Sequence, residues 1–296
     1  MESYTIGGST FDDFQSFGRR CGCSRPSYVK RQQVDAKLRE FRDANATFRT
    51  LPGAIEIPIQ FTHITDGATG QITAQERQDQ VEVLNGAYGP HGITFSYDEA
   101  QVRVVDNADW FRMGHDSAAE RVAKSALGVD PEATLNFYTT DGGGLLGWAT
   151  FPWELEGDPV TDGVVMVYTS LPNVGRPPYN EGQTATHEIG HWLGLYHTFQ
   201  GGCAATGDHV GDTVPHDGPN YGTPQVGLQH NACDPNALAP VQNYMNYVDD
   251  AWMNSFTDGQ VARMRDMVGT FRPKLLGNPN SDVRLAQACN QVSRVL

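Results

Sequence analysis

Long hydrophobic runs are missing from the 296-residue sequence. A membrane-spanning helix needs roughly 18 or more consecutive apolar residues, and residues 1–8 carry neither the basic start nor the apolar stretch of a secretory signal. We therefore expect no insertion into a membrane. If the protein is exported, its signal peptide is not part of this sequence.

Basic residues and cysteines are also scarce. The 21 Lys and Arg stand against 35 Asp and Glu, a formal net charge of −14. A field of that sign repels phosphate backbones and anionic lipids, so no nucleic-acid partner is expected and cationic partners fit better. Five cysteines are too few for a disulfide scaffold, and their odd number leaves at least one thiol unpaired within a monomer.

The charge is unevenly distributed along the chain. Residues 1–50 hold nine Lys and Arg against six Asp and Glu, a net of +3, and the remaining residues hold 12 against 29, a net of −17. The sequence Leu-Pro-Gly at 51–53 is a break between the two. We predict a basic N-terminal segment over 1–50 and a main domain over 51–296. An ordinary arm with a solvated helix over 28–42 would explain the composition equally well.

Periodicity predicts a mixed α+β first half of the main domain, over 51–197. Alternation over 54–64 indicates a strand that Pro58 places at an edge or a bulge. Thr73 and Glu76 form a capping box for the next helix. Further strands are predicted over 93–97, 101–105, 134–140, 145–151 and 163–169, with a helix over 117–127. The second half, 198–296, is predicted to be irregular over 201–240 and to end in a helix capped by Thr257.

One motif carries the chemistry. Residues 186–197 read THEIGHWLGLYH. His187 and His191 are one helical turn apart, so both imidazoles leave one face at a spacing that suits a tetrahedral zinc ion. Glu188 is placed to take a proton from a water at that ion. Gly194 can end the helix and let His197 return as the third ligand, which leaves a fourth position open.

The extended motif resembles the zinc signature of the metzincin metallopeptidases. A second element of that group is a tight turn with a methionine, and residues 243–250, NYMNYVDD, are similar to the turn of its pappalysin family. The resemblance covers roughly residues 54–272. It implies a metzincin-type α+β catalytic domain with zinc ligands His187, His191 and His197, the turn methionine Met245, and Tyr247 as a donor to the transition state.

The same resemblance implies that a disulfide and calcium hold the irregular segment. Cys203 and Cys233 flank it, and the run 206–213 offers oxygen ligands, among which we expect Asp208, Asp212 and Thr213 to bind calcium. No EF-hand spacing is present, so a solvated acidic loop is the alternative.

The basic segment resembles the cysteine-switch element of latent metallopeptidases at residues 19–22, Arg-Arg-Cys-Gly. A Cys21 thiolate would occupy the open zinc position and block catalysis. Cys23 makes the choice of thiol ambiguous, and one of the two could pair with Cys289 instead. A plain disulfide or free thiols in a tail is the alternative interpretation.

Together these features predict a secreted zinc endopeptidase that is made as a latent zymogen and inhibited by its own N-terminal segment. The strand over 145–151 would pair with an extended protein or peptide substrate, with Trp148 among the contacts. Asp249 and Asp250 would favour Arg or Lys after the scissile bond. The rival is a catalytically silent, zinc-stabilised binding module, against which the retained Glu188 argues.

Overall fold

The computed structural model describes residues 4–6, 9–11, 21–23, 26–45, 53–175, 177–204, 206–225 and 227–276, with only the backbone for 4–6 and 9–11. Within these ranges, no helix combines the length and the apolar character needed to cross a membrane. The bound of 50 for the N-terminal segment lies outside the described residues, as does Cys289.

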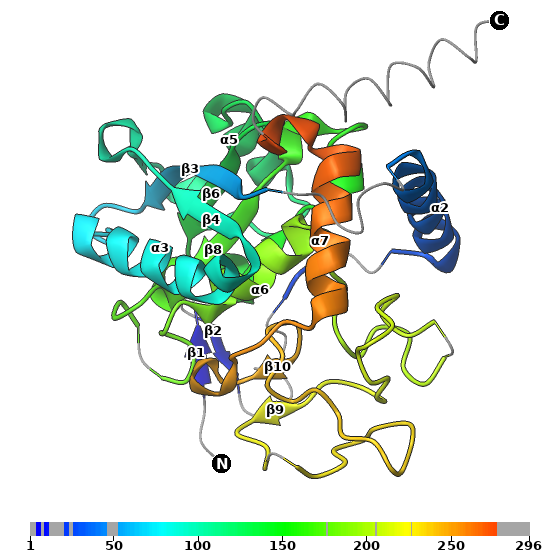
Figure 1. The fold of residues 1–296 in the computed structure, drawn as a ribbon. Helices are drawn as coiled ribbons and strands as arrows, with labels where there is room; N and C mark the ends of the chain where they lie inside the picture. Colours follow the sequence, from blue (N-terminus) through cyan, green and yellow to red (C-terminus); the bar gives the residue numbers. More distant parts are fainter. Residues whose placement is uncertain are drawn as a thin grey trace, which may run out of the picture.

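A six-stranded sheet forms the centre of the main domain (Figure 1). Its spatial order is β4-β3-β6-β8-β7, with β5 pairing to β3 beyond the end of β4. All pairs are parallel except β7 with β8, so β7 is an antiparallel edge strand. The strands are β3 Ile55–Thr65, β4 Ile93–Ser96, β5 Arg103–Asp106, β6 Leu135–Thr140, β7 Gly147–Ala149 and β8 Val164–Val167.

The helices begin where the capping residues predict. Thr73 and Thr257 form complete capping boxes with Glu76 and Gln260, and the Ser117 hydroxyl accepts from the Glu120 N–H. The helices are α2 Tyr28–Ala44, α3 Ala74–Tyr88, α4 Ala108–Phe111, α5 Ala118–Leu127, α6 Gln183–Trp192 and α7 Asp258–Phe271. Short 3-10 turns lie at Gly89–His91, Glu99–Gln101, Gly142–Gly144, Pro152–Glu154, Pro159–Thr161, Tyr168–Ser170, Asp250–Trp252 and Pro273–Leu276.

Helices α3 and α6 pack side by side against the sheet (Figure 1). The Tyr88 hydroxyl at the end of α3 donates to the Thr186 carbonyl in α6 at 2.7 Å, and Gln80 Nε2 donates to the Gly182 carbonyl at 3.1 Å. All of α6 from Thr184 to Trp192 is buried. The helix that carries the histidine motif is therefore held by the core on every side.

The prediction that Pro58 marks an edge is correct for its own part of β3 only. Residues 55–58 pair with β4, with Pro58 opposite Ser96, while the β6 ladder on the other side of β3 begins one residue later at Ile59. In the described residues, Pro58 is therefore paired on one side. The strand as a whole is central in the sheet, which local sequence could not show because it depends on where two distant strands pair.

A buried ion pair connects three elements around the sheet. Asp162 is bound by Arg272, the C-cap of α7, with Oδ1–Nη2 and Oδ2–Nη1 distances of 2.6 and 3.2 Å. Its carboxylate also accepts from Trp192 Nε1 at the end of α6 (3.0 Å) and from the Thr150 hydroxyl just after β7 (3.0 Å). The Arg272 guanidinium lies 3.9 Å from the centre of the Trp192 ring.

The second half, beyond residue 197, is largely irregular, as predicted. A disulfide joins Cys203 to Cys233. Strands β9 Tyr221–Gly222 and β10 Tyr247–Val248 pair in parallel and tie the segment to the turn that contains Met245. Helix α7 then returns to the first half.

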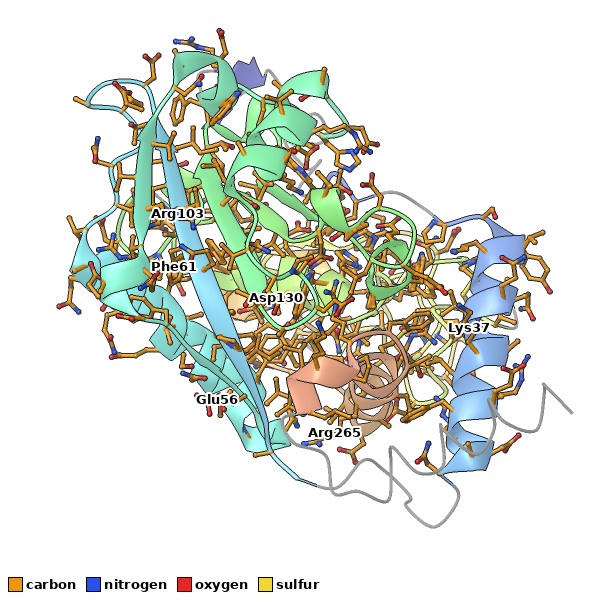
Figure 2. The ribbon with its side chains drawn as sticks, turned by 90° about the horizontal axis from the view of Figure 1, so that it is seen from above. Lys37, Glu56, Phe61, Arg103, Asp130 and Arg265 are labelled. Atoms are coloured by element: carbon orange, nitrogen blue, oxygen red, sulfur yellow. A yellow bond between two sulfur atoms is a disulfide. The ribbon has the colours of Figure 1, made fainter. Side chains whose placement is uncertain are left out.

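The N-terminal segment is packed against the main domain rather than separate from it. The backbone of Tyr4–Ile6 and Ser9–Phe11 forms the hairpin β1-β2. Helix α2 lies beside α7 (Figure 1), and its Val34 and Leu38 belong to the same hydrophobic core as the sheet. Figure 2 shows Lys37 on the face of α2 that is turned to the main domain, where it pairs with Glu156 at 2.8 Å.

Candidate active site

Three imidazoles converge at the end of α6. His191 Nε2 lies 3.2 Å from His187 Nε2 and 3.1 Å from His197 Nε2. Gly194 makes the turn between them with a φ of +94°, and a Cβ there would lie 2.4 Å from Met267 Cγ. Only glycine fits this position, because both the backbone angle and the space exclude a side chain.

The outer ring nitrogens orient the imidazoles. His187 Nδ1 donates to the Tyr244 carbonyl and His191 Nδ1 to the Leu195 carbonyl, each at 2.7 Å. A carbonyl can only accept, so these Nδ1 atoms carry the protons and the Nε2 lone pairs are left for a metal. Burial lowers the pKa of His191 to about 4, which keeps the ring neutral near pH 7.

This donor set fits zinc. Two nitrogens bound to one ion at about 2.05 Å with a tetrahedral angle lie about 3.3 Å apart, close to the spacing of the Nε2 atoms. Neutral imidazole is a preferred zinc ligand, and three such ligands with an open fourth position are typical of catalytic sites. His187, His191 and His197 are therefore brought together as the motif predicts.

The methionine turn lies directly beneath the histidines. Met245 is fully buried, and its N–H donates to Asn243 Oδ1 at 2.9 Å. A Cβ built on Gly190 would lie 2.4 Å from Met245 Sδ, so glycine in α6 allows the thioether to approach the helix. The carbonyl of Tyr244, the residue before Met245, accepts the hydrogen bond from His187 Nδ1. The turn therefore also sets the orientation of a proposed zinc ligand.

Tyr247 reaches the same centre. Its hydroxyl lies 3.1 Å from His197 Nε2. Burial raises the pKa of the phenol well above its usual value, so the hydroxyl keeps its proton and remains a donor.

Glu188 and the two N-terminal cysteines meet on the other side of the histidines. The Cys21 and Cys23 thiols both lie within hydrogen-bonding distance of Glu188 Oε2, at 3.3 and 3.0 Å. Cys21 Sγ and one nitrogen of each of the three histidines all lie within 4.8 Å of one another. Neither cysteine is in a disulfide. The contact of Cys23 with Glu188 was not expected from the sequence, although the Cys-x-Cys spacing had raised the question.

Edge strand β7 carries this N-terminal segment. The Gly22 N–H donates to the Gly147 carbonyl at 2.9 Å, and Cys21 forms a parallel bridge with Gly147. The strand thus pairs with the N-terminal segment at Gly147, whereas its pairing with a substrate over 145–151 stays a prediction. With residues 21–23 in place, the Trp148 side chain is 1% exposed, and its Nε1 donates to Glu120 in α5 at 2.6 Å. A Cβ on Gly22 would lie 3.4 Å from Trp148 Cβ, so the predicted contact of Trp148 with a bound chain also stays a prediction.

The two aspartates after the methionine turn contact different segments. Asp250 is buried, its Oδ2 accepts from the Glu181 N–H at 3.0 Å, and its own N–H donates to the Pro178 carbonyl. The Asp249 N–H donates to the Gly222 carbonyl at 2.9 Å. Asp250 thus fixes the loop that leads into α6, a structural task that its sequence position did not reveal.

The predicted calcium ligands separate into two groups. Asp208 Oδ2 and Thr213 Oγ1 are buried, with no hydrogen-bond partner in the described part of the chain. Burial raises the pKa of the Asp208 carboxyl to about 7. Asp212 instead caps α7, because its two oxygens accept from the Thr257 hydroxyl at 2.7 Å and the Gly259 N–H at 2.8 Å. Its carboxylate is already occupied by the helix.

Comparisons with known proteins agree with this geometry. The family model described as pregnancy-associated plasma protein-A matches residues 146–269. Extracellular metalloprotease 1 of Coccidioides posadasii is 37% identical over 264 residues, 86% of this chain and 91% of that protein. An extracellular metalloprotease of Colletotrichum graminicola is 34% identical, over 87% of this chain and 91% of its own length.

Two solved structures from Tannerella forsythia are also similar. A promirolysin mutant has a TM-score of 0.70 at 26% identity and covers 87% of this chain and 97% of its own. Mature mirolysin in complex with a cleaved peptide has a TM-score of 0.65 at 26% identity, covering 77% of this chain and 99% of its own.

The fold and the histidine site define a metalloendopeptidase of the metzincin type. Within that class, the chain belongs to the pappalysin family, named for pregnancy-associated plasma protein-A. The family and the fold class predicted from the two motifs are thereby confirmed.

Proposed function

We propose that this metalloendopeptidase is a secreted zinc enzyme that is synthesised in a latent form. The observation that carries the proposal is the convergence of three imidazoles, in which His191 Nε2 lies 3.2 and 3.1 Å from the Nε2 atoms of His187 and His197. The Glu188 carboxylate lies beside them and is not needed as a ligand. Secretion is supported by relatives that are named extracellular metalloproteases.

In the proposed reaction, an extended peptide pairs with β7, which holds its scissile bond over the three histidines. When bound, zinc would polarise the scissile carbonyl and acidify a water molecule. Glu188 takes the proton of the attacking water and delivers it to the leaving amine. Tyr247, whose phenol stays protonated, donates a hydrogen bond to the oxyanion that develops on the carbonyl.

Latency would follow from the N-terminal segment. Residues 21–23 lie on β7, where the substrate would bind, and Cys21 Sγ lies among the three histidines. A thiolate is a strong zinc ligand and would take the open position. Burial raises the pKa of the Cys21 thiol to about 12 in the metal-free protein, so binding would require the metal to displace the thiol proton.

For specificity, we propose that Arg or Lys is preferred after the scissile bond. The main domain carries a net charge of −17, counted over residues 51–296, and Asp249 and Asp250 follow the methionine turn. Because Asp250 already holds the Glu181 N–H, Asp249→Asn is expected to reduce the preference more selectively than Asp250→Asn. Matched peptides with Arg, Lys, Leu or Glu after the scissile bond measure this. Equal rates for Arg and Leu in the unmodified enzyme would contradict the preference.

We also propose a structural calcium at Asp208 and Thr213. Asp208 Oδ1 accepts from the Val210 N–H at 3.1 Å, which leaves the buried Oδ2 and the neighbouring Thr213 hydroxyl as oxygen ligands that a hard cation takes. A cation would offset the cost of burying Asp208 as an anion. Chelation of calcium should lower the unfolding temperature while zinc is retained. An unchanged unfolding temperature would count against this site.

Replacement of Glu188 tests the central proposal. Glu188→Ala should keep the fold and the bound zinc, because the three histidines and not this carboxylate would hold the ion. Peptide turnover should fall by at least about 10²-fold. The assay is peptidase activity after the N-terminal segment has been cleaved, with zinc measured on the same samples. Turnover near that of the unmodified enzyme would refute the assignment of the base.

A further inference from the structure

The two N-terminal cysteines contact different parts of the active site. Cys21 Sγ is grouped with all three histidines, whereas Cys23 Sγ is grouped with Glu188, His191 and Cys21. Cys23 is also the closer of the two thiols to Glu188 Oε2, at 3.0 Å against 3.3 Å. The two sulfurs are therefore not equivalent candidates for a single role.

Cys23 has a second contact that Cys21 lacks. The Ala149 N–H of edge strand β7 donates to Cys23 Sγ at 3.2 Å. The Cys23 side chain is 9% exposed and belongs to the hydrophobic core. Its sulfur thus lies between the proposed base and a backbone donor of the strand on which a substrate would lie.

We infer that Cys23 is a second inhibitory residue, which blocks the base Glu188 and the Ala149 amide while Cys21 blocks the metal position. This inference rests on the latency proposed above and names a separate part of it. The Cys23 thiol donates to Glu188 Oε2, so it competes with a water molecule for that oxygen and lowers the basicity of the carboxylate. Substrate pairing requires free strand amides, and Cys23 Sγ already accepts the one at Ala149.

If Cys21 binds the metal, Cys23 becomes the thiol that donates to Glu188. A thiolate bound to a metal has no proton, so Cys21 in that state cannot donate to Glu188. The hydrogen bond to the base would then come from Cys23 alone. Gly22 between them passes close to β7, and a Cβ there would lie 2.4 Å from Leu145 Cδ1, so any larger residue would have to displace the Leu145 side chain.

The experiment compares Cys23→Ala, Cys23→Ser and Cys21→Ser in the full chain. Initial peptidase rates are measured while mass spectrometry shows the N-terminal segment to be intact. Cys23→Ala should raise the rate of the intact chain by about 10-fold or more, the factor expected from losing a hydrogen bond to a charged group. Cys23→Ser keeps an O–H donor of similar size and should stay within about threefold of the unmodified chain.

A second measurement separates the two thiols without using activity. With cobalt in place of zinc, a sulfur-to-cobalt charge-transfer band reports a bound thiolate. The band should disappear in Cys21→Ser and persist in Cys23→Ala. Loss of the band in Cys23→Ala would make Cys23 the metal ligand and overturn the assignment. Equal rate increases in Cys23→Ala and Cys23→Ser, or no increase in either, would overturn it as well.

The same preparations after cleavage of the N-terminal segment provide the control. Once the cleaved segment has been separated from the enzyme, all Cys23 variants should match the unmodified enzyme, because they no longer contain the residue. Full activity of the cleaved enzyme combined with an ineffective Cys23→Ala would refute only the second inhibitory role. An inactive cleaved enzyme containing zinc would refute the proposed function itself.

Discussion

The buried Asp162–Arg272 pair should dominate the stability of the main domain among its ion pairs. Both side chains are at most 1% exposed, and the carboxylate accepts four hydrogen bonds, two from Arg272 and one each from Trp192 and Thr150. Asp162→Ala leaves the guanidinium buried without its counter-ion. Removing one partner of such a pair costs about 3–5 kcal/mol.

For a domain of this size, each kcal/mol lowers the unfolding temperature by about 2–4 °C, so Asp162→Ala should unfold about 6–20 °C lower. Thermal unfolding followed by circular dichroism measures this. Asp158→Ala is the matched control, because Asp158 pairs with Arg121 at the surface, where side chains are 36% and 58% exposed and a pair contributes about 0–1 kcal/mol.

Replacement of both partners gives a further check. Asp162→Leu combined with Arg272→Met removes both charges together, so it should recover part of the loss seen in Asp162→Ala. If Asp162→Ala lowers the unfolding temperature no more than Asp158→Ala does, the Asp162–Arg272 pair does not stabilise the domain as its burial implies. The reasoning would then be refuted.

Three further predictions concern other parts of the chain. Replacing Cys203 and Cys233 together by Ser should lower the free energy of unfolding by about 3.6 kcal/mol, from their sequence separation of 30, and an unchanged urea midpoint would contradict this. Burial lowers the pKa of His63 to about 3, so the unfolded chain takes up a proton near pH 6.5 while the folded chain does not, and stability falls as the pH falls. Between pH 6.5 and 4.5 the unmodified protein should lose about 2.3 kcal/mol more than His63→Gln in urea unfolding; parallel losses would exclude this role for His63. Gly190→Ala should cost about 1–3 kcal/mol and reduce bound zinc, because its Cβ would lie 2.4 Å from Met245 Sδ. Gly86→Ala in α3, where a Cβ meets nothing within 4 Å, should be neutral or stabilising, and equal effects at the two glycines would contradict the packing argument.

Sequence reasoning was most accurate where the signal is local. The capping boxes at Thr73 and Thr257 predicted helix starts that the structure has, and the spacing of His187 and His191 predicted two rings on one face. These features depend on residues within one or two turns of each other. The resemblance to a family supplied the partner of this helix, the turn at Met245, which lies far along the chain.

Long-range contacts explain the differences. Pro58 indicates a position without pairing on one side, but which part of β3 is unpaired there depends on the distant strands β4 and β6. Asp250 and Asp212 were predicted as binding residues from their acidic side chains. In the structure, Asp250 accepts from the N–H of Glu181 and Asp212 from that of Gly259, because carboxylates are also the preferred caps of exposed backbone donors. The sequence alone cannot distinguish an aspartate that binds a metal or a substrate from one that accepts hydrogen bonds from backbone N–H groups.

Helix α2 gives the N-terminal segment a second point of attachment. Asp35 lies 3.2 Å from Arg263 in α7, and only residues 24–27 separate Cys23 from the start of α2 at Tyr28. Because the connection between the two binding points is short, binding at one of them keeps the other near its site at an effective concentration of roughly millimolar or above. A cut within residues 46–52 would therefore leave a bivalent fragment that rebinds each point while the other remains attached. Under the latency proposed above, activation would be completed by dissociation of that fragment or by a second cut between Cys23 and α2, and the lag after the first cleavage would be set by avidity.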